Sequence, residues 1–124
     1  MGYFKKIKLL NYRNFTSYEN DFSERCNVLC GENGSGKTNI LESLSLLNQG
    51  KGFRKEILFN IKKFNKNEPW IIFSKYNNSK VDDIACSYEK KESGSLSKNL
   101  IINGTKIKKI KNVDNFPIIL WFIP

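Results

Sequence analysis

The alternation of hydrophobic and polar residues predicts strands in the first part of the chain. From Phe4 to Phe15, lysine and asparagine alternate with apolar side chains, which predicts a strand at an exposed edge of a sheet. A second short strand is predicted from Ser17 to Phe22, after a turn at Arg13-Asn14. Residues 27–30 read Asn-Val-Leu-Cys and predict a short buried strand that leads directly into a glycine-rich loop.

Between Lys37 and about Asn48 the hydrophobic period lengthens to that of an α-helix. The predicted apolar face comprises Ile40, Leu41, Leu44 and Leu47, and the other face Thr38, Asn39, Glu42, Ser45 and Asn48. Gly50 follows and is expected to end the helix by adopting the left-handed backbone conformation. We therefore expect an amphipathic helix that carries Glu42 and Ser45 on its polar face.

The second half of the chain has the pattern of a β-rich region. Strands are predicted at Trp70–Lys75 and Ile84–Glu89. Asn103-Gly104 lies at the centre of residues 99–108, and this pair predicts a hairpin because both residues accept the positive φ angles of a type I′ turn. The apolar run between Pro117 and Pro124 predicts a strand buried on both faces.

Composition excludes several classes of protein. The chain has 124 residues, 40% of them hydrophobic and 27% charged, which is enough for a packed core in one small domain or part of a larger one. It contains no histidine, which excludes Ser-His-Asp triads, Cys-His dyads and His-ligated metal sites. The longest apolar run, Ile118–Ile123, is far shorter than the ~20 residues of a membrane span. Without an apolar signal-peptide core at the start, we expect a cytoplasmic protein with no membrane association.

Cysteine usage and net charge add weaker indications. Cys26, Cys30 and Cys86 form no C-x-x-C pair, and we expect reduced thiols in the core. The formal net charge of +9 permits an anionic partner, but 18 of the 21 basic residues are lysine, which is typical of a compositional bias. Clusters at Lys62-Lys63 and residues 106–111 are therefore interpreted first as solvated surface.

Residues 31–38 carry the strongest functional signal. They read, in order, Gly31, Glu32, Asn33, Gly34, Ser35, Gly36, Lys37 and Thr38, a complete G-x-x-x-x-G-K-[ST] match. The glycines let successive amide N–H groups point into one concavity at the positive end of the following helix, which suits phosphates. Lys37 supplies a mobile charge for the β- and γ-phosphates, and Thr38 a hydroxyl ligand for Mg²⁺. The motif predicts binding of a nucleoside triphosphate with Mg²⁺.

Residues for hydrolysis are not recognisable in the sequence. Hydrolysis needs a second acidic residue, usually at the end of an apolar strand, and a group that orients water. The apolar run at residues 70–73 is followed by Ser74 and the run at 118–123 by Pro124, while Asp82 and Asp83 precede a predicted strand. We therefore assign no catalytic residue, and we expect the chain alone to lack significant ATPase activity.

The chain resembles the N-terminal part of the RecF family of bacterial DNA repair ATPases, which is related to the Rad50 and SMC group of ABC-type ATPases. The stretches that carry the resemblance are residues 9–15, 27–43, 50–54 and 121–124. The resemblance implies an α/β fold, a P-loop NTPase (ABC-type) lobe with an antiparallel β side-sheet. It also implies that Arg13 matches the family's arginine that approaches the nucleotide phosphates.

The resemblance also implies a domain organisation and a function. Residues 26–48 would form the strand, phosphate loop and helix of an ATP-binding head, and residues 69–124 its β-rich part. The family's helical arm, signature motif and second acidic strand lie downstream of the position of Pro124, so we expect an N-terminal fragment. Glu92–Leu96 is only superficially similar to the signature motif.

The implied function is that of an ATP-binding, DNA-binding protein of DNA replication and recombinational repair, active at single-strand gaps and linked to the SOS response. The implied cofactors are ATP and Mg²⁺. The implied partners are single-stranded and gapped double-stranded DNA, recombination mediator proteins, and a second copy in an ATP-dependent homodimer.

Two other functions fit the motif. A P-loop phosphotransferase would need an acceptor pocket and an arginine-rich lid, and the chain has only three arginines, Arg13, Arg25 and Arg54. A DNA-binding module with a vestigial nucleotide site would bind DNA but not ATP. Parallel titrations with DNA and with ATP separate these alternatives.

Overall fold

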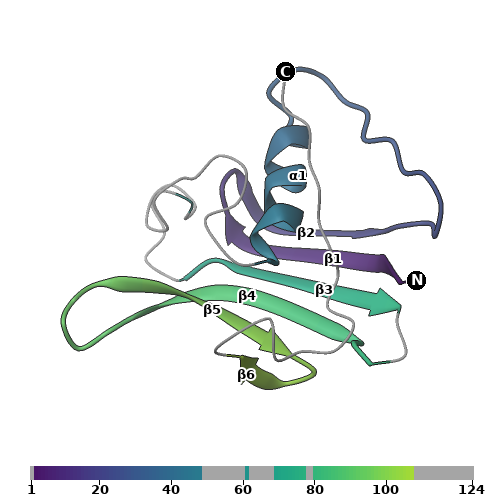
Figure 1. Cartoon of the computed structure of the whole chain (residues 1–124). Helices are drawn as coiled ribbons and strands as arrows, with labels where there is room; N and C mark the ends of the chain where they lie inside the picture. Colours follow the sequence, from purple (N-terminus) through teal and green to yellow (C-terminus); the bar gives the residue numbers. More distant parts are fainter. Residues whose placement is uncertain (1, 49–60, 62–68, 78–79, 108–124) are drawn as a thin grey trace.

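One antiparallel sheet and one helix make up the regular structure of the described chain (Figure 1). The structure, a computed structural model, describes residues 2–48, 61, 69–77 and 80–107. Its elements are β1 (Tyr3–Tyr12), β2 (Phe15–Asp21), α1 (Lys37–Leu46), β3 (Ile71–Asn77), β4 (Asp83–Lys90), β5 (Leu96–Ile102) and β6 (Thr105–Ile107). The strands are ordered β2-β1-β3-β4-β5-β6, and every neighbouring pair is antiparallel. The predicted antiparallel sheet is thus present.

The strand β1 lies inside the sheet, so its predicted edge position is wrong. It pairs with β2 on one side and with β3 on the other, for example through Ile7, whose Cα partners are Asn20 and Ser74. Along β1, Ile7 and Leu9 are buried whereas Lys8 is exposed. The alternation of lysine and apolar residues therefore indicates that one face of the sheet is solvated, as an antiparallel sheet permits. It does not indicate that β1 lies at an edge.

Residues 27–30 do not form the predicted buried strand. The structure assigns no strand to them, and the Val28 side chain is 78% exposed. A strand requires a neighbour for its backbone N–H and C=O groups, and the six described strands pair among themselves without this segment. A local apolar run is therefore not sufficient to form a strand here.

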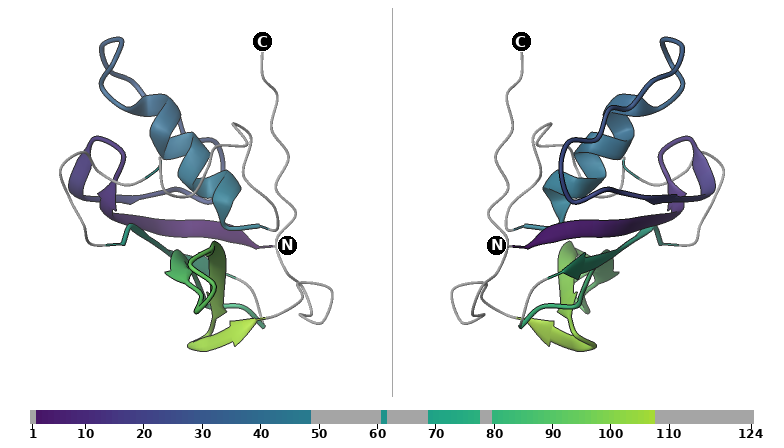
Figure 2. Two further views of the ribbon diagram at one scale, coloured as in Figure 1. Left: turned by 90° about the vertical axis from the view of Figure 1, so that its left-hand side faces the viewer. Right: turned by 90° about the vertical axis from the view of Figure 1, so that its right-hand side faces the viewer.

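The helix α1 forms where predicted, and its predicted apolar face is confirmed at Ile40 and Leu47, which are buried, but the buried face also includes residues predicted to be exposed. It lies on one side of the sheet next to β1 (Figures 1 and 2). Glu42, Ser43 and Ser45 are buried, although the pattern places Glu42 and Ser45 on the polar face. Leu41, predicted on the apolar face, is 52% exposed. The buried hydroxyls are satisfied within the helix, since Ser43 Oγ donates to the Ile40 carbonyl and Ser45 Oγ to that of Glu42.

The predicted hairpin at Asn103-Gly104 is confirmed. β5 and β6 flank the pair, and both residues have positive φ angles, 51° for Asn103 and 82° for Gly104. The Asn103 side chain also contacts the β3–β4 connection, because its Oδ1 accepts from the amides of Asp82 and Asp83 at 2.8 and 3.1 Å. The predictions for Gly50, Lys62-Lys63, residues 108–111 and residues 117–124 lie outside the described residues.

The core lies between α1 and the buried face of the sheet. Trp70 is fully buried and packs against Tyr12 and Tyr88, with ring centroids 6.1 and 5.6 Å apart. Among the cysteines, Cys86 is buried in this core, whereas Cys26 and Cys30 are exposed, so the prediction of core thiols holds only for Cys86. The difference follows from position, since Cys86 lies in β4 and the other two in the exposed segment before α1.

We predict that the three thiols differ in reactivity. Burial raises the pKa of Cys86 to about 12, so this thiol stays protonated and inaccessible at pH 8. Titration of the native chain with dithionitrobenzoate should label Cys26 and Cys30 rapidly and Cys86 only after unfolding.

The Cys86→Ala variant is the control, because its native labelling should equal that of the parent chain. The raised pKa of Cys86 also makes the free energy of unfolding fall as the pH rises from about 9 towards 12, because in this range only the thiol of the unfolded chain ionises. Rapid labelling of Cys86 in the folded chain would contradict this placement of the core.

Candidate phosphate-binding site

The loop of residues 31–36 is exposed and leads into the first turn of α1. Gly34 and Gly36 have φ angles of 84° and 100°, in the left-handed region that side chains disfavour. Gly36 is the N-cap of α1, and its carbonyl accepts from the Ile40 amide at 3.0 Å. The first turn of α1 contains no acidic residue, so no carboxylate within it offsets the positive end of the helix dipole.

Lys37 folds back over this loop. Its Nζ donates a hydrogen bond to the Gly31 carbonyl, while the Ser35 amide donates to the Glu32 carbonyl at 3.2 Å. A Cβ atom at Gly31 would lie 2.8 Å from Ser35 Oγ, so a side chain there would require the Ser35 hydroxyl to move. The Lys37 ammonium group is therefore held against the loop, close to where phosphate would bind.

The β1–β2 turn is packed against the start of α1. A Cβ atom at Gly36 would lie 2.7 Å from Phe15 Cζ and 2.8 Å from Asn14 Nδ2, so only glycine permits this approach. Asn39 in the first turn of α1 donates from Nδ2 to Asn14 Oδ1 at 2.9 Å. The turn that carries Arg13 is thus held beside the phosphate loop.

Arg13 forms a two-point ion pair with Glu42 of α1. Its Nε and Nη2 atoms donate to Glu42 Oε1 and Oε2 at 2.9 and 2.8 Å, and Tyr12 Oη donates to Oε1 at 2.5 Å. The Glu42 side chain is 1% exposed and that of Arg13 18%. Hydrogen bonding to Glu42 raises the pKa of Arg13, and burial raises that of Tyr12, so the guanidinium stays charged and the phenol protonated.

A second contact anchors the other end of α1. Lys98 in β5 donates from Nζ to the carbonyls of Leu46, at 3.0 Å, and Asn48. Carbonyl groups at a helix C-terminus lack partners within the helix and carry partial negative charge, so a lysine there is stabilising. Burial lowers the pKa of Lys98. The helix is thereby fixed to β1 through Glu42 and to β5 through Lys98.

The structure brings the predicted site residues together to different degrees. Residues 31–38 lie together at the start of α1, with Thr38 exposed, and Arg13 lies next to them through its bond to Glu42. Sequence reasoning missed the roles of Asn14, Asn39 and Glu42. For Glu42 the available signal was a carboxylate one helical turn beyond Thr38, a spacing that also suits a solvated face.

A protein-built metal centre is not visible in the described ranges. No group of three or more Cys, Asp or Glu residues that could hold a metal ion occurs there. Mg²⁺ with a nucleotide needs only one or two protein ligands beside water and phosphate oxygens, and the exposed Thr38 hydroxyl fits that requirement. Glu92–Leu96, the superficial signature motif, covers the β4–β5 turn and the first residue of β5, and Gly94 in the turn has a φ of 86°.

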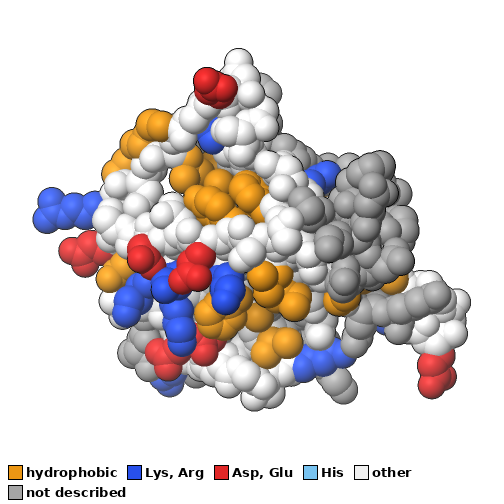
Figure 3. All heavy atoms as spheres, turned by 180° about the vertical axis from the view of Figure 1, so that it is seen from behind, with side chains coloured by type: hydrophobic (Ala, Val, Ile, Leu, Met, Phe, Trp, Pro, Cys, Tyr) orange, Lys and Arg blue, Asp and Glu red, His pale blue; other side chains and the backbone are white. Residues whose placement is uncertain are grey.

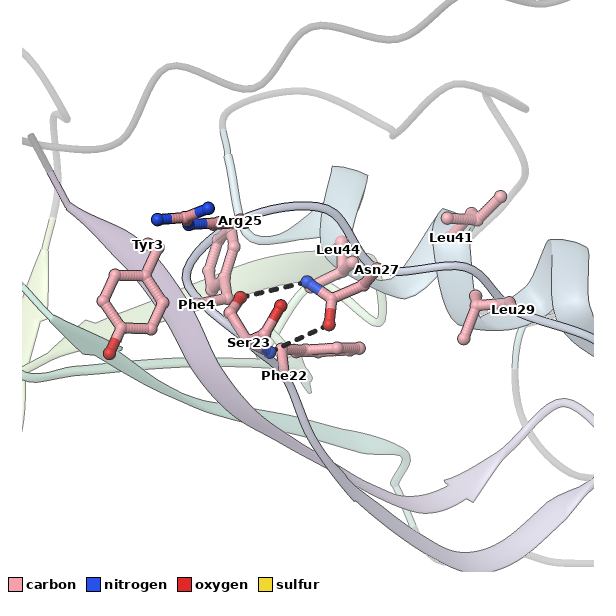
Figure 4. Close-up of a pocket in the computed structure, with 9 residues that line it drawn as sticks. All are labelled: Tyr3, Phe4, Phe22, Ser23, Arg25, Asn27, Leu29, Leu41 and Leu44. Carbon is pink, nitrogen blue, oxygen red and sulfur yellow. Dashed lines mark hydrogen bonds between the residues drawn. The ribbon is translucent and has the colours of Figure 1, made fainter.

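A largely apolar groove lies beside the site and does not include the phosphate loop (Figure 4). It has a volume of about 330 Å³ and is lined by Tyr3, Phe4, Phe22, Ser23, Arg25, Asn27, Leu29, Leu41 and Leu44. Asn27 and Ser23 close one wall through paired hydrogen bonds of 2.9 and 3.0 Å. None of residues 31–38 lines this groove.

Two basic residues on the open face of the sheet, Lys6 and Lys75, are paired with acids. Lys6 Nζ lies 2.8 Å from Glu19 and 3.6 Å from Asp21, and Lys75 Nζ lies 2.7 Å from Asp83. Figure 3 shows acidic and basic side chains intermixed beside hydrophobic ones on the face that it presents. This pairing favours the interpretation of these lysines as solvated surface over that of a phosphate-binding stripe.

None of the helices formed by the described residues is long and apolar enough to cross a membrane.

The chain is similar in sequence to one family of known domains and to individual proteins. The sequence model of the AAA ATPase domain family matches residues 3–118. The chain is 29% identical over 120 residues to the DNA replication and repair protein RecF of Rhizobium meliloti, covering 96% of this chain and 32% of that protein. It is 40% identical over 111 residues to RecF of Francisella tularensis subsp. novicida, covering 86% of this chain and 31% of that protein.

A solved protein structure is similar to this chain as well. The structure of the recombination mediator protein RecF with ATP in the RecFOR pathway is similar at a TM-score of 0.70 and 29% identity, covering 86% of this chain and 29% of that one. The likenesses confirm the resemblance to RecF and the fold class inferred from the sequence. The chain spans about a third of the length of the curated relatives that it matches (32% and 31%).

We predict that Gly36 and Gly34 respond differently to alanine. Gly34→Ala strains a positive φ in open space and should lower the free energy of unfolding by about 1–2 kcal/mol. Gly36→Ala adds contact with Asn14 and Phe15 and should lower it by about 2–5 kcal/mol. Urea unfolding without nucleotide measures both, and equal losses would contradict the close packing of the β1–β2 turn.

Proposed function

This chain belongs to the AAA ATPase domain family, and we propose that it binds ATP with Mg²⁺ at residues 31–38 and acts in DNA replication and recombinational repair. The observation that carries the proposal is the exposed glycine loop at the N-terminus of α1, with the Lys37 ammonium folded over it. The RecF relatives, one of which has been solved with ATP, support the choice of nucleotide.

Each part of the loop has a role in the proposed binding. The amide groups of residues 31–36 and the first turn of α1 donate to phosphate oxygens, which are attracted by the positive end of the helix. Lys37 exchanges the neutral Gly31 carbonyl for a charged phosphate oxygen, a stronger acceptor. Thr38 would hold Mg²⁺ through its hydroxyl, and the bound ion would neutralise charge on the phosphates. We include Arg13 as a further phosphate contact.

The remaining features of the proposal follow the relatives. We infer that residues 26–48 and 69–124 belong to one ATP-binding head and that the chain is cytoplasmic. Proposed partners are single-stranded and gapped double-stranded DNA, recombination mediator proteins, and a second copy in an ATP-dependent dimer. The net charge of +9 is compatible with DNA as a partner, and the RecF names support replication and repair as the setting. We assign no catalytic residue.

We predict that Lys37→Ala weakens binding of ATP·Mg²⁺ about 10–100-fold, because it removes a charge-assisted hydrogen bond. Lys91→Ala is the matched control: it removes the same charge from the exposed β4–β5 turn and should leave affinity unchanged. Isothermal calorimetry on the folded chain measures both. A parent chain that binds DNA but no ATP would instead favour a DNA-binding module with a vestigial nucleotide site.

We also predict that ATP protects one cysteine from alkylation. Cys30 is exposed and precedes Gly31 directly, so a nucleotide on the loop should shield it. Cys26 is exposed four residues earlier and is the internal control. Peptide mass spectrometry after brief iodoacetamide treatment should show slower labelling of Cys30 alone when ATP and Mg²⁺ are present. Equal rates with and without nucleotide would count against this site.

A further inference from the structure

Glu42 is a carboxylate enclosed between α1 and the sheet. Its side chain is 1% exposed, and its two oxygens accept hydrogen bonds from Tyr12 Oη, Arg13 Nε and Arg13 Nη2. A buried carboxylate is tolerated only when its oxygens are well satisfied, so this set of donors holds it in one place. The motif in residues 31–38 does not include Glu42, and the proposed function so far gives it no role.

The ion pair leaves Arg13 with one edge engaged and one edge available. A guanidinium group presents five N–H donors in a rigid plane. The Nε and Nη2 atoms form the edge that Glu42 holds, at 2.9 and 2.8 Å. Within the described part of the chain, Nη1 has no hydrogen-bond partner. Because two bonds fix the plane, the direction in which this second edge points is also fixed.

The turn that carries Arg13 is fixed at the start of α1. Asn14, the residue after Arg13, contacts Gly36 and is bonded to Asn39, so the turn cannot move away from the loop without losing both contacts. Side chains on a helix lean towards its N-terminus, which places the Glu42 carboxylate over the turn that contains Thr38. The Arg13 guanidinium is therefore held by a carboxylate of the helix that begins at the phosphate loop.

We propose that Glu42 is a positioning residue for nucleotide binding, one that holds Arg13 by one edge so that the other edge meets the bound phosphates. This inference rests on the proposed function. The change in ATP affinity expected on removing the Glu42 charge is opposite in sign to that of a purely electrostatic effect. If Glu42 only neutralised Arg13, removing its charge would strengthen the binding of a polyanion, whereas loss of a positioning residue weakens it.

Calorimetric titration of the full chain with ATP and Mg²⁺ tests this difference in sign. Glu42→Gln should weaken binding about tenfold, Arg13→Ala should weaken it by a similar factor, and the double variant should be no weaker than Arg13→Ala alone. Glu19→Gln is the charge-matched control, since it removes an exposed carboxylate that pairs with Lys6 on the sheet. Affinity of Glu42→Gln equal to or higher than that of the parent chain would overturn the inference.

Two further variants separate positioning from stability. Tyr12→Phe removes one hydrogen bond from the same carboxylate and leaves both bonds to Arg13, so it should lower the melting temperature while ATP affinity falls much less than in Glu42→Gln. Should Glu42→Gln fail to fold, Arg13→Lys keeps the charge but cannot make the two-point contact, and it should bind ATP about tenfold more weakly. Parent-like binding by Arg13→Lys would refute positioning.

The parent chain distinguishes this inference from the function on which it rests. A folded parent chain that takes up no ATP would overturn the proposed function and this inference together. A parent chain that binds ATP, with Glu42→Gln binding equally well, would overturn the role of Glu42 alone.

Discussion

The attachment of α1 to the sheet through the buried Glu42 carboxylate is the contact on which the candidate site depends. Tyr12 and Arg13 reach this carboxylate from β1 and the turn that follows it, and Lys98 holds the opposite end of the helix from β5. A phosphate loop can act only if the helix behind it is fixed, because its amides must point to one place. These contacts supply that rigidity to an otherwise exposed loop.

The loop itself combines openness with local constraint. Gly34 and Gly36 adopt backbone angles that favour glycine, and Gly36 in addition meets the β1–β2 turn too closely for any side chain. The first turn of α1 carries no acidic residue, and the Lys37 ammonium occupies a neutral carbonyl that a phosphate oxygen can replace. The Lys37 ammonium and the positive end of α1 therefore favour an anion at the site, whereas Lys6 and Lys75 on the open face of the sheet are paired with acids.

Features determined by neighbouring residues could be predicted from the sequence, and features determined by distant pairing could not. The Asn103-Gly104 turn, the helix and the glycine loop depend on local backbone preferences and were placed correctly. The interior position of β1 depends on pairing with β3, more than sixty residues away in the chain (Ile7 with Ser74). The burial of Glu42 depends on hydrogen bonds donated by Tyr12 and Arg13, which lie 30 and 29 residues earlier in the chain. A carboxylate in a helical pattern indicates a solvent-exposed position unless its partners are known, which is why the pattern places Glu42 on the exposed face.

The central claim is that phosphates bind to the amides at the start of α1. The most direct measurement is a titration of the ¹⁵N-labelled chain with ATP and Mg²⁺, followed by amide chemical shifts. The account predicts that the largest saturable shifts occur at residues 31–38, with smaller ones at Arg13 and Asn14. A well-dispersed spectrum that does not change, or one whose largest shifts lie on β4–β6, would contradict it.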